Sequence, residues 1–133
     1  MVWAVRRITM VYSTQDAFAL VRRNGNVVTW GQAHHGGDSS AVREQLTDIC
    51  SISSTRWAFA AIKIDGSVVT WGSGVTGGDS SEVRQQLTDI SSISSTGSAF
   101  AALKADGSVV TWGYAVTGGD SSAVREQLAV LNS

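Results

Sequence analysis

The chain has 133 residues, of which 43% are hydrophobic and 16% are charged, and its formal net charge is −1. This composition predicts one globular domain with a buried core and argues against a disordered chain. A strong basic excess, which is typical of general nucleic-acid binders, is absent, so we do not expect a nucleic-acid partner. The single cysteine, Cys50, excludes an internal disulfide.

The first residues, MVWAVRRITMVYS, contain no uninterrupted apolar stretch of signal-peptide length, because Arg6 and Arg7 interrupt them. No other segment approaches the roughly 20 apolar residues that cross a bilayer. We therefore expect a soluble, cytoplasmic protein with no membrane partner.

One pattern occurs three times along the chain. Trp30, Trp71 and Trp112 are 41 residues apart, and the second and third units are identical at 30 of 41 positions. The units span about 8–48, 49–89 and 90–130. A repeat of this length is typical of a solenoid, a propeller or a pseudo-symmetric closed fold, so we expect one repeat domain over residues 1–133.

Each unit begins with three predicted strands, which the third unit illustrates. ISSISST at 90–96 alternates Ile with Ser, as does a strand with one buried face. AFAALK at 99–104 is apolar on both faces, which favours a strand packed between two layers. Asp106-Gly107 then favours a tight two-residue hairpin turn, and SVVTW at 108–112 is a β-branched return strand.

The repeated aromatic residues of these strands are predicted to lie in the core in every unit. They are Phe18, Phe59, Phe100, Trp30, Trp71 and Trp112.

The last part of each unit, GGDSSAVREQL or a close variant, predicts a loop that enters a short helix. Asp38, Asp79 and Asp120 are candidate N-caps, and Asp79 with Glu82 fits a capping box. Val and Leu four positions apart would lie on one face of such a helix and dock onto the hairpin. An irregular fourth strand is the alternative.

The stretch ISSISSTGSAFAALKADGSVVTWG at 90–113 resembles the core of an RCC1-type repeat, and the resemblance covers about 24 of the 41 residues in each unit. It implies β-propeller blades that act as interaction platforms. The family's Gly-Gln-Leu-Gly segment and its following proline are absent, and three units are fewer than the family's usual number of blades. Founding members bind chromatin and promote nucleotide exchange on a small GTPase. The matching functional residues are missing here, so we infer neither activity.

The predicted fold is therefore mainly β with short helices, in three 41-residue RCC1-like blades. Three arrangements would satisfy the ends of such an array. A homo-oligomer, a dimer or a trimer, could complete a propeller. One chain could instead close on itself as a trefoil-like monomer with pseudo-threefold symmetry. An open short solenoid is the third arrangement, and its exposed end faces would be a liability.

Residues that break the repeat, or that lie in its variable loops 32–35, 73–76 and 114–117, are the candidate binding residues. Non-repeated aromatic residues on a repeat scaffold favour an interface, although they could also fill gaps in the core. Clustered arginines could form an anion-binding face or a solvated strand edge. The candidates are Trp3, Trp57, Arg6, Arg7, Arg22, Arg23, His34, His35 and Tyr114.

No pattern in the sequence indicates catalysis or a metal. His34 and His35 lack a nearby cysteine or carboxylate pair at ligand spacing, and no Gly-x-Ser-x-Gly elbow is present. Repeated serines are more naturally architectural, because a catalytic residue is needed only once. We expect a non-enzymatic scaffold without a cofactor, which acts as a structural or protein-interaction module and associates with itself. A small-ligand or carbohydrate-binding module is the alternative.

Overall fold

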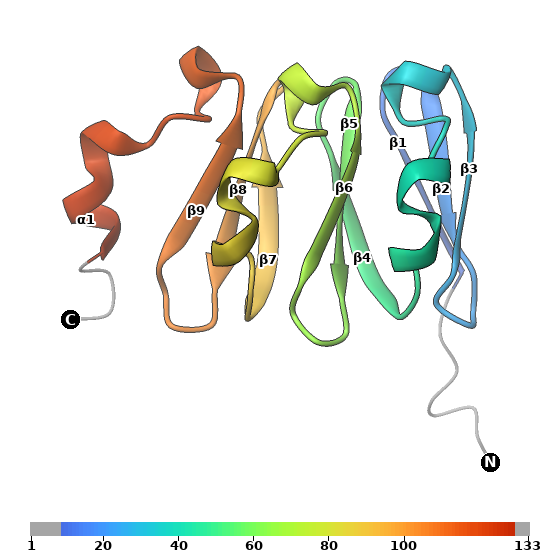
Figure 1. Cartoon of the computed structure of the whole chain (residues 1–133), viewed down its shortest axis with the longest axis horizontal. Helices are drawn as coiled ribbons and strands as arrows, with labels where there is room; N and C mark the ends of the chain where they lie inside the picture. Colours follow the sequence, from blue (N-terminus) through green and yellow to red (C-terminus); the bar gives the residue numbers. More distant parts are fainter. Residues whose placement is uncertain (1–8, 130–133) are drawn as a thin grey trace.

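Each repeat forms one three-stranded antiparallel sheet in the computed structural model, which describes residues 9–129 (Figure 1). The strands of a sheet are paired in chain order. They are β1 (Met10–Ser13), β2 (Ala17–Val21) and β3 (Val27–Gly31), then β4 (Ile49–Ser54), β5 (Ala58–Lys63) and β6 (Val68–Gly72), then β7 (Ile90–Ser95), β8 (Ala99–Lys104) and β9 (Val109–Gly113). The prediction of a mainly β fold with three similar units is confirmed.

The hairpin turns are longer than predicted. Lys104 N–H donates to the Ser108 carbonyl at 2.9 Å, so residues 105–107 form a three-residue connection. Gly107 adopts a φ of 91°, which the glycine tolerates without steric cost. The Ser108 N–H also donates to Asp106 Oδ1 at 2.9 Å. The predicted two-residue turn is therefore wrong, because the glycine occupies the third loop position.

The last part of each unit is helical, which excludes the irregular fourth strand. The helices are mostly 3₁₀: η2 (Ala33–His35), η3 (Ser40–Gln45), η4 (Gly74–Thr76), η5 (Ser81–Gln86), η6 (Ala115–Thr117) and η7 (Ser122–Val124), followed by the short α1 (Arg125–Ala129). Among the described residues, no helix is long and apolar enough to cross a membrane.

The predicted N-caps are displaced by one residue. Ser39, not Asp38, is the N-cap of η3, and its side chain makes no capping hydrogen bond. Asp38 Oδ1 instead accepts the Ser40 N–H at 2.9 Å. Asp79 likewise accepts the Ser81 N–H at 3.0 Å, and Glu82 takes no part. The aspartates therefore stabilise the turn that enters each helix. Each of them accepts a hydrogen bond from the N–H two residues later, as in an Asx turn.

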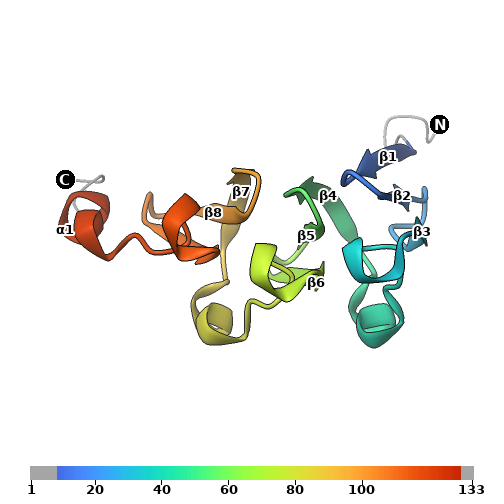
Figure 2. The same ribbon diagram turned by 90° about the horizontal axis from the view of Figure 1, so that it is seen from above.

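The three units stand side by side in a row, with the first and third units at opposite ends (Figures 1 and 2). Strands β1, β4 and β7 lie along one side of the row, whereas η3 and η5 lie along the other (Figure 2). The self-closed trefoil-like alternative is therefore wrong, because the terminal units do not meet. The row that residues 9–129 form is open at both ends.

The hydrophobic core lies between the units. Alternation along β5 sends Phe59 and Ala61 toward the first unit and Ala58, Ala60 and Ile62 toward the third. Each middle strand is thus buried on both faces only where it has a neighbour on each side. The first core contains Ala17, Ala19, Val21, Leu46, Ile49, Ile52, Phe59, Ala61, Val69 and Trp71. The second contains Ala58, Ala60, Ile62, Leu87, Ile90, Phe100, Ala102, Val110 and Trp112.

Candidate protein-interaction surfaces

A tryptophan and a glycine join neighbouring units in the same way at both internal junctions. Trp71 Nε1 donates to the Gly36 carbonyl at 3.1 Å, and Trp112 Nε1 donates to the Gly77 carbonyl at 3.0 Å. A Cβ atom on Gly77 would lie 2.4 Å from Cδ2 of Phe100, so only glycine lets this ring pack there. The junction therefore depends on a glycine of one unit and the aromatic pair of the next.

Backbone and hydroxyl hydrogen bonds repeat across the junctions as well. Ser54 Oγ donates to the Ser13 carbonyl at 2.8 Å, and Ser95 Oγ donates to the Ser54 carbonyl at 2.7 Å. In the opposite direction, the N–H of one unit donates to a carbonyl of the next: Gln15 to Arg56 at 3.0 Å, and Arg56 to Gly97 at 2.8 Å. Each junction is thus specified by directional contacts in addition to apolar burial.

The first unit presents its aromatic pair to solvent. Phe18 and Trp30 are 45% and 46% exposed, whereas Phe59 and Trp71 are 0% and 5% exposed in the second unit. The prediction that all six repeated aromatic residues lie in the core is wrong for these two, because no described unit precedes the first. We call this surface the head face. It consists of Val11, Phe18, Leu20, Val28 and Trp30.

The third unit leaves the complementary surface open. Leu103 is 42% exposed, whereas Ile62 at the equivalent position is 8% exposed. Gly118 is exposed, although Gly36 and Gly77 are buried beneath the rings of Phe59 and Phe100. We call this surface the tail face. It consists of Ala101, Leu103, Gly118 and Val124.

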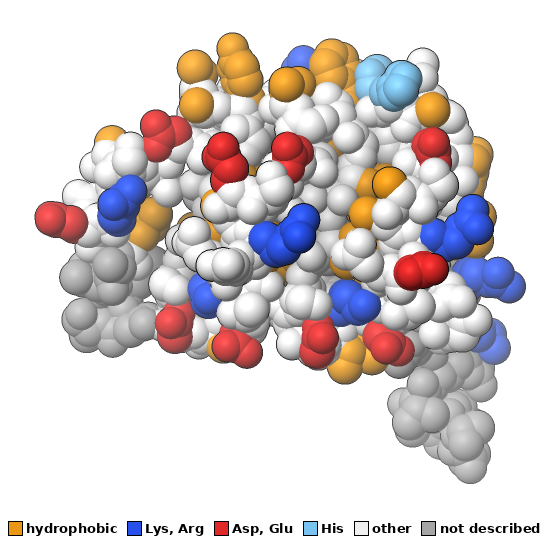
Figure 3. Space-filling model, in the orientation of Figure 1, with side chains coloured by type: hydrophobic (Ala, Val, Ile, Leu, Met, Phe, Trp, Pro, Cys, Tyr) orange, Lys and Arg blue, Asp and Glu red, His pale blue; other side chains and the backbone are white. Residues whose placement is uncertain are grey.

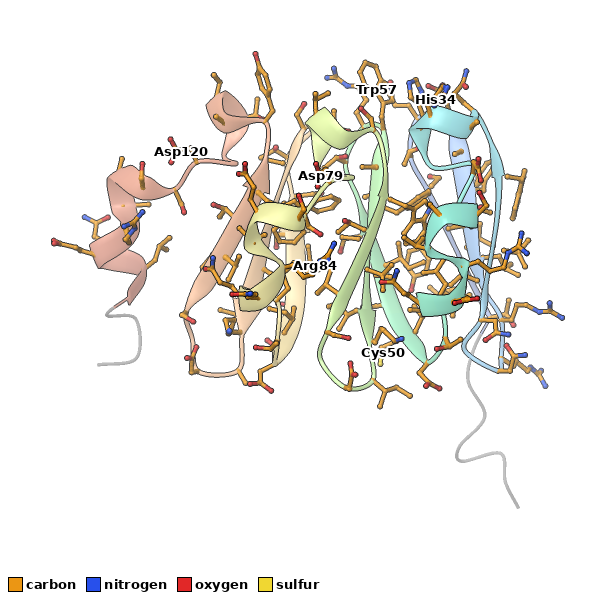
Figure 4. All side chains as sticks on the ribbon, in the orientation of Figure 1. His34, Cys50, Trp57, Asp79, Arg84 and Asp120 are labelled. Atoms are coloured by element: carbon orange, nitrogen blue, oxygen red, sulfur yellow. The ribbon has the colours of Figure 1, made fainter. Side chains whose placement is uncertain are left out.

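A second candidate surface is the upper rim, which contains the β1–β2, β4–β5 and β7–β8 connections together with η2, η4 and η6. Trp57 stacks on His35 with ring centroids 4.6 Å apart, and Arg56 lies 5.6 Å from the Trp57 ring. His35 Nδ1 is 2.8 Å from Asp16 Oδ2. Figure 4 places the labelled Trp57 and His34 on this same rim. The structure therefore brings together residues of the first and second units that sequence reasoning had named separately.

Hydrophobic side chains gather along the upper rim, whereas acidic side chains are prominent along the lower edge (Figure 3). Tyr114 belongs to the upper rim, since its N–H donates to the Ser98 carbonyl at 2.8 Å, and its side chain is exposed. Sequence reasoning missed Asp16 and Arg56 as members of the rim cluster. The available signal was their relation to the non-repeated Trp57: Arg56 precedes it in the chain, and Asp16 occupies the equivalent position in the first unit.

The remaining candidates do not join the rim. Arg22 and Arg23 are exposed in the hairpin at the opposite end of β2. Three further candidates, Trp3, Arg6 and Arg7, lie outside the described residues. Across residues 9–129, no group of three or more histidine, cysteine or acidic side chains is placed to hold a metal ion.

Grooves also occur between the units, but their repetition marks them as architectural. A groove of about 720 Å³ lies between the second and third units and includes Asp79, Trp112 and Arg125 in its lining. A smaller one of about 340 Å³ lies between the first and second units, beside Val42 and Lys63. Both follow from the placement of a short helix beside the outer strand of the next unit.

The aspartates along the edges have structural partners. Hydrogen bonds from Ser67 and Ser108 lower the pKa of Asp65 and Asp106, and those from Ser40 lower the pKa of Asp38. The turns that these carboxylates stabilise therefore favour their ionised form.

Solved structures with a similar arrangement of sheets include those of RCC1-like proteins. Human WBSCR16 superposes with a TM-score of 0.59 at 17% identity, over 82% of this chain and 33% of that one. Prp20p from Saccharomyces cerevisiae, studied for its binding to Gsp1p and histones, gives 0.56 at 19% identity, over 78% and 30%. A structure of Kap60 bound to yeast RCC1 (Prp20) gives 0.57 at 18% identity, over 81% and 30%.

This chain has an RCC1-like repeat fold. It spans about a third of the length of the RCC1-like structures that it matches, and its units correspond to part of their propeller. No family model matches the sequence, and no curated protein matches it. At these identities the RCC1-like likeness concerns the fold alone, because one fold supports many functions.

Proposed function

We propose that the protein is a non-enzymatic scaffold, a structural or protein-interaction module that associates with itself through its terminal units. One observation carries the proposal: the aromatic pair that is buried at both internal junctions is exposed on the first unit. Exposed apolar surface of this kind, with a polar surround, is typical of protein–protein contacts.

The distribution of polar residues supports a scaffold in preference to an enzyme. Repeated serines and threonines hold the units together, as Ser54 and Ser95 do through their hydroxyl groups. Within the second unit, Thr55 Oγ1 donates to the buried Thr76 carbonyl at 2.7 Å. A side chain that already serves one architectural hydrogen bond in each unit is a poor candidate for a nucleophile, which requires a base within reach.

The proposal is tested by the mass of the chain in solution. Sedimentation or light scattering, from low micromolar to submillimolar concentration, should show a discrete dimer or trimer of the 14.0 kDa chain. Such an oligomer would complete further blades of the propeller. A single 14.0 kDa species over the whole range would contradict self-association.

A further inference from the structure

The head and tail faces are the two halves of a junction that the chain already forms twice. At each internal junction, the head-type face of a later unit packs on the tail-type face of the unit before it. Among residues 9–129, no unit covers the head face of the first unit, and no unit covers the tail face of the third unit. The interface between copies can therefore be deduced from the interface within one copy.

We propose that self-association is head to tail: the head face of one copy packs on the tail face of a second copy and reproduces the internal junction. This inference rests on the proposed function and adds the geometry of the contact. It assigns to each copy two different binding surfaces, so the contact is heterologous.

The hydrogen-bonding groups at the two ends are complementary. The head face offers Trp30 Nε1, whose counterparts Trp71 and Trp112 each donate to a glycine carbonyl of the preceding unit. The tail face offers the matching carbonyl, that of Gly118. Among the described residues, neither the Trp30 Nε1 donor nor the Gly118 carbonyl has a hydrogen-bond partner. At the two internal junctions, the equivalent tryptophan donors and glycine carbonyls are hydrogen-bonded to each other.

Two further pairs follow from the same register. Ser13 Oγ on the head side corresponds to Ser54 and Ser95, each of which donates to the serine carbonyl one unit earlier. Its acceptor in a second copy is the Ser95 carbonyl. The Gly97 N–H on the tail side corresponds to those of Gln15 and Arg56, so its acceptor is the Gln15 carbonyl of the second copy.

The apolar groups also fit. A Cβ on Gly118 would meet no atom of the described residues closer than 3.9 Å, whereas a Cβ on Gly36 would lie 2.6 Å from the ring of Phe59. Space for an incoming ring is therefore present over Gly118, and Phe18 is the ring that the register brings there. Burial of this apolar surface stabilises the contact, as it does within the chain.

A head-to-tail contact is heterologous, because it uses a different face on each copy, and such contacts form rings when their rotation closes. A symmetric, isologous contact uses the same face on both copies and ends at two copies. If the head faces instead paired with each other, only head-face residues would matter and the tail face would be free.

Two substitutions separate the ends. Val28→Arg places a charge at a head-face position whose counterpart Val69 is 5% exposed, and Ala101→Arg does so at a tail-face position whose counterpart Ala60 is 0% exposed. Ile64→Arg, at an isoleucine of the β5–β6 turn that is 57% exposed and belongs to neither face nor to the upper rim, is the matched control. The melting temperature of each variant, taken at low concentration, shows whether it folds.

We expect the Val28→Arg and Ala101→Arg variants to be monomeric when each is alone. Mixed in equal amounts, they should form a 1:1 heterodimer, because one intact head face and one intact tail face remain. The Ile64→Arg variant should associate as the unsubstituted chain does. Labelling one variant with a fluorophore and measuring the mass of the mixture distinguishes a heterodimer from either homodimer.

The outcomes discriminate between the two proposals. If the unsubstituted chain associates but mixing rescues nothing, the head-to-tail geometry is overturned and self-association stands. If only Val28→Arg dissociates, the contact joins two head faces, which also overturns the geometry. If the unsubstituted chain stays monomeric, both proposals fail.

A milder variant covers the case in which an arginine unfolds the chain. Trp30→Phe keeps the ring and removes only the Nε1 donor, so it should weaken association about threefold to tenfold, as expected for one neutral hydrogen bond. The double variant Trp30→Phe/Leu103→Ala also removes an apolar side chain from the tail face, so it should associate more weakly still. An unchanged dissociation constant in both would overturn the proposed register.

Discussion

The first and second units have nearly the same strands but different surroundings. Phe18 stacks on Trp30 with centroids 5.4 Å apart, and Phe59 packs on Trp71 at 5.2 Å. Yet the first pair is about half exposed and the second is buried. The comparison teaches that, in a repeat protein, the burial of a residue depends on the unit next to it as much as on its own strand.

The largest effect should come from matched truncations of the two phenylalanines. Phe59→Ala leaves a cavity in the core between units and should lower the free energy of unfolding by about 3–5 kcal/mol. Phe18→Ala, at a half-exposed site, should cost no more than about half of that in the monomer. Urea unfolding at a concentration below the onset of association measures both, and equal losses would contradict the comparison.

Glycine substitutions at a buried and an open junction position should give the next largest difference. Gly77→Ala strains a backbone with φ of 109° and places Cβ 2.4 Å from the Phe100 ring, whereas Gly118→Ala carries the backbone strain alone. We expect Gly77→Ala to cost about 1–3 kcal/mol more than Gly118→Ala, the typical range for overpacking. Thermal melting of the two variants side by side provides the difference. A larger loss from Gly118→Ala would be inconsistent with an open tail face.

The tryptophan hydrogen bond offers a smaller contrast. Trp71→Phe leaves the Gly36 carbonyl without its donor in a buried site, so it should cost about 1–3 kcal/mol. Trp30→Phe should leave the stability of the monomer nearly unchanged, because Trp30 Nε1 has no acceptor among the described residues. Chemical denaturation of dilute samples compares them. Similar losses in both would indicate that Trp30 is engaged within the chain.

The hairpin turns provide the smallest contrast, which depends on pH. Asp65 and Asp106 have pKa values lowered by hydrogen bonds from Ser67 and Ser108, whereas the first unit has Asn24, which accepts the Asn26 N–H at 3.0 Å and does not titrate. A carboxyl whose pKa is lower in the folded state stabilises the fold above its unfolded pKa, about 3.9, and this contribution is lost as the pH falls through the folded value.

We therefore expect Asp65→Asn to flatten the loss of stability below about pH 4 and to change little at neutral pH. Denaturation midpoints between neutral and acidic pH, with Asn24→Asp as the reciprocal variant, test this. The reciprocal variant should steepen the acid transition. An acid transition that neither substitution alters would show that other carboxyl groups control it.

Much of one unit could be predicted from its residues alone. The alternation in 90–96, the apolar run in 99–104 and the β-branched 108–112 correspond to β7, β8 and β9 within about a residue at each end. Local preferences are strong there because each strand has a distinct pattern. The turn length and the helix caps were predicted less well, since Asp106-Gly107 and Asp38 are compatible with several closely related turns.

The rim cluster was named residue by residue but not as a cluster. His35 and Trp57 are more than half a repeat apart in sequence, and only the packing of the first unit on the second stacks their rings. Asp16, which pairs with His35, occupies in the first unit the position that Trp57 occupies in the second. The exchange of one residue type at one repeated position thus produced two partners for the same histidine.

The sequence by itself determined the unit: three strands, a glycine-containing turn, a short helix and an aromatic pair, repeated at a constant interval. Hydrophobic periodicity and turn chemistry act within a few residues, so they are the same in every copy. Only the tertiary structure decided which copies of that pair are buried, because burial requires a neighbouring unit. It therefore decided that the row formed by residues 9–129 is open and that its two ends carry complementary halves of one junction.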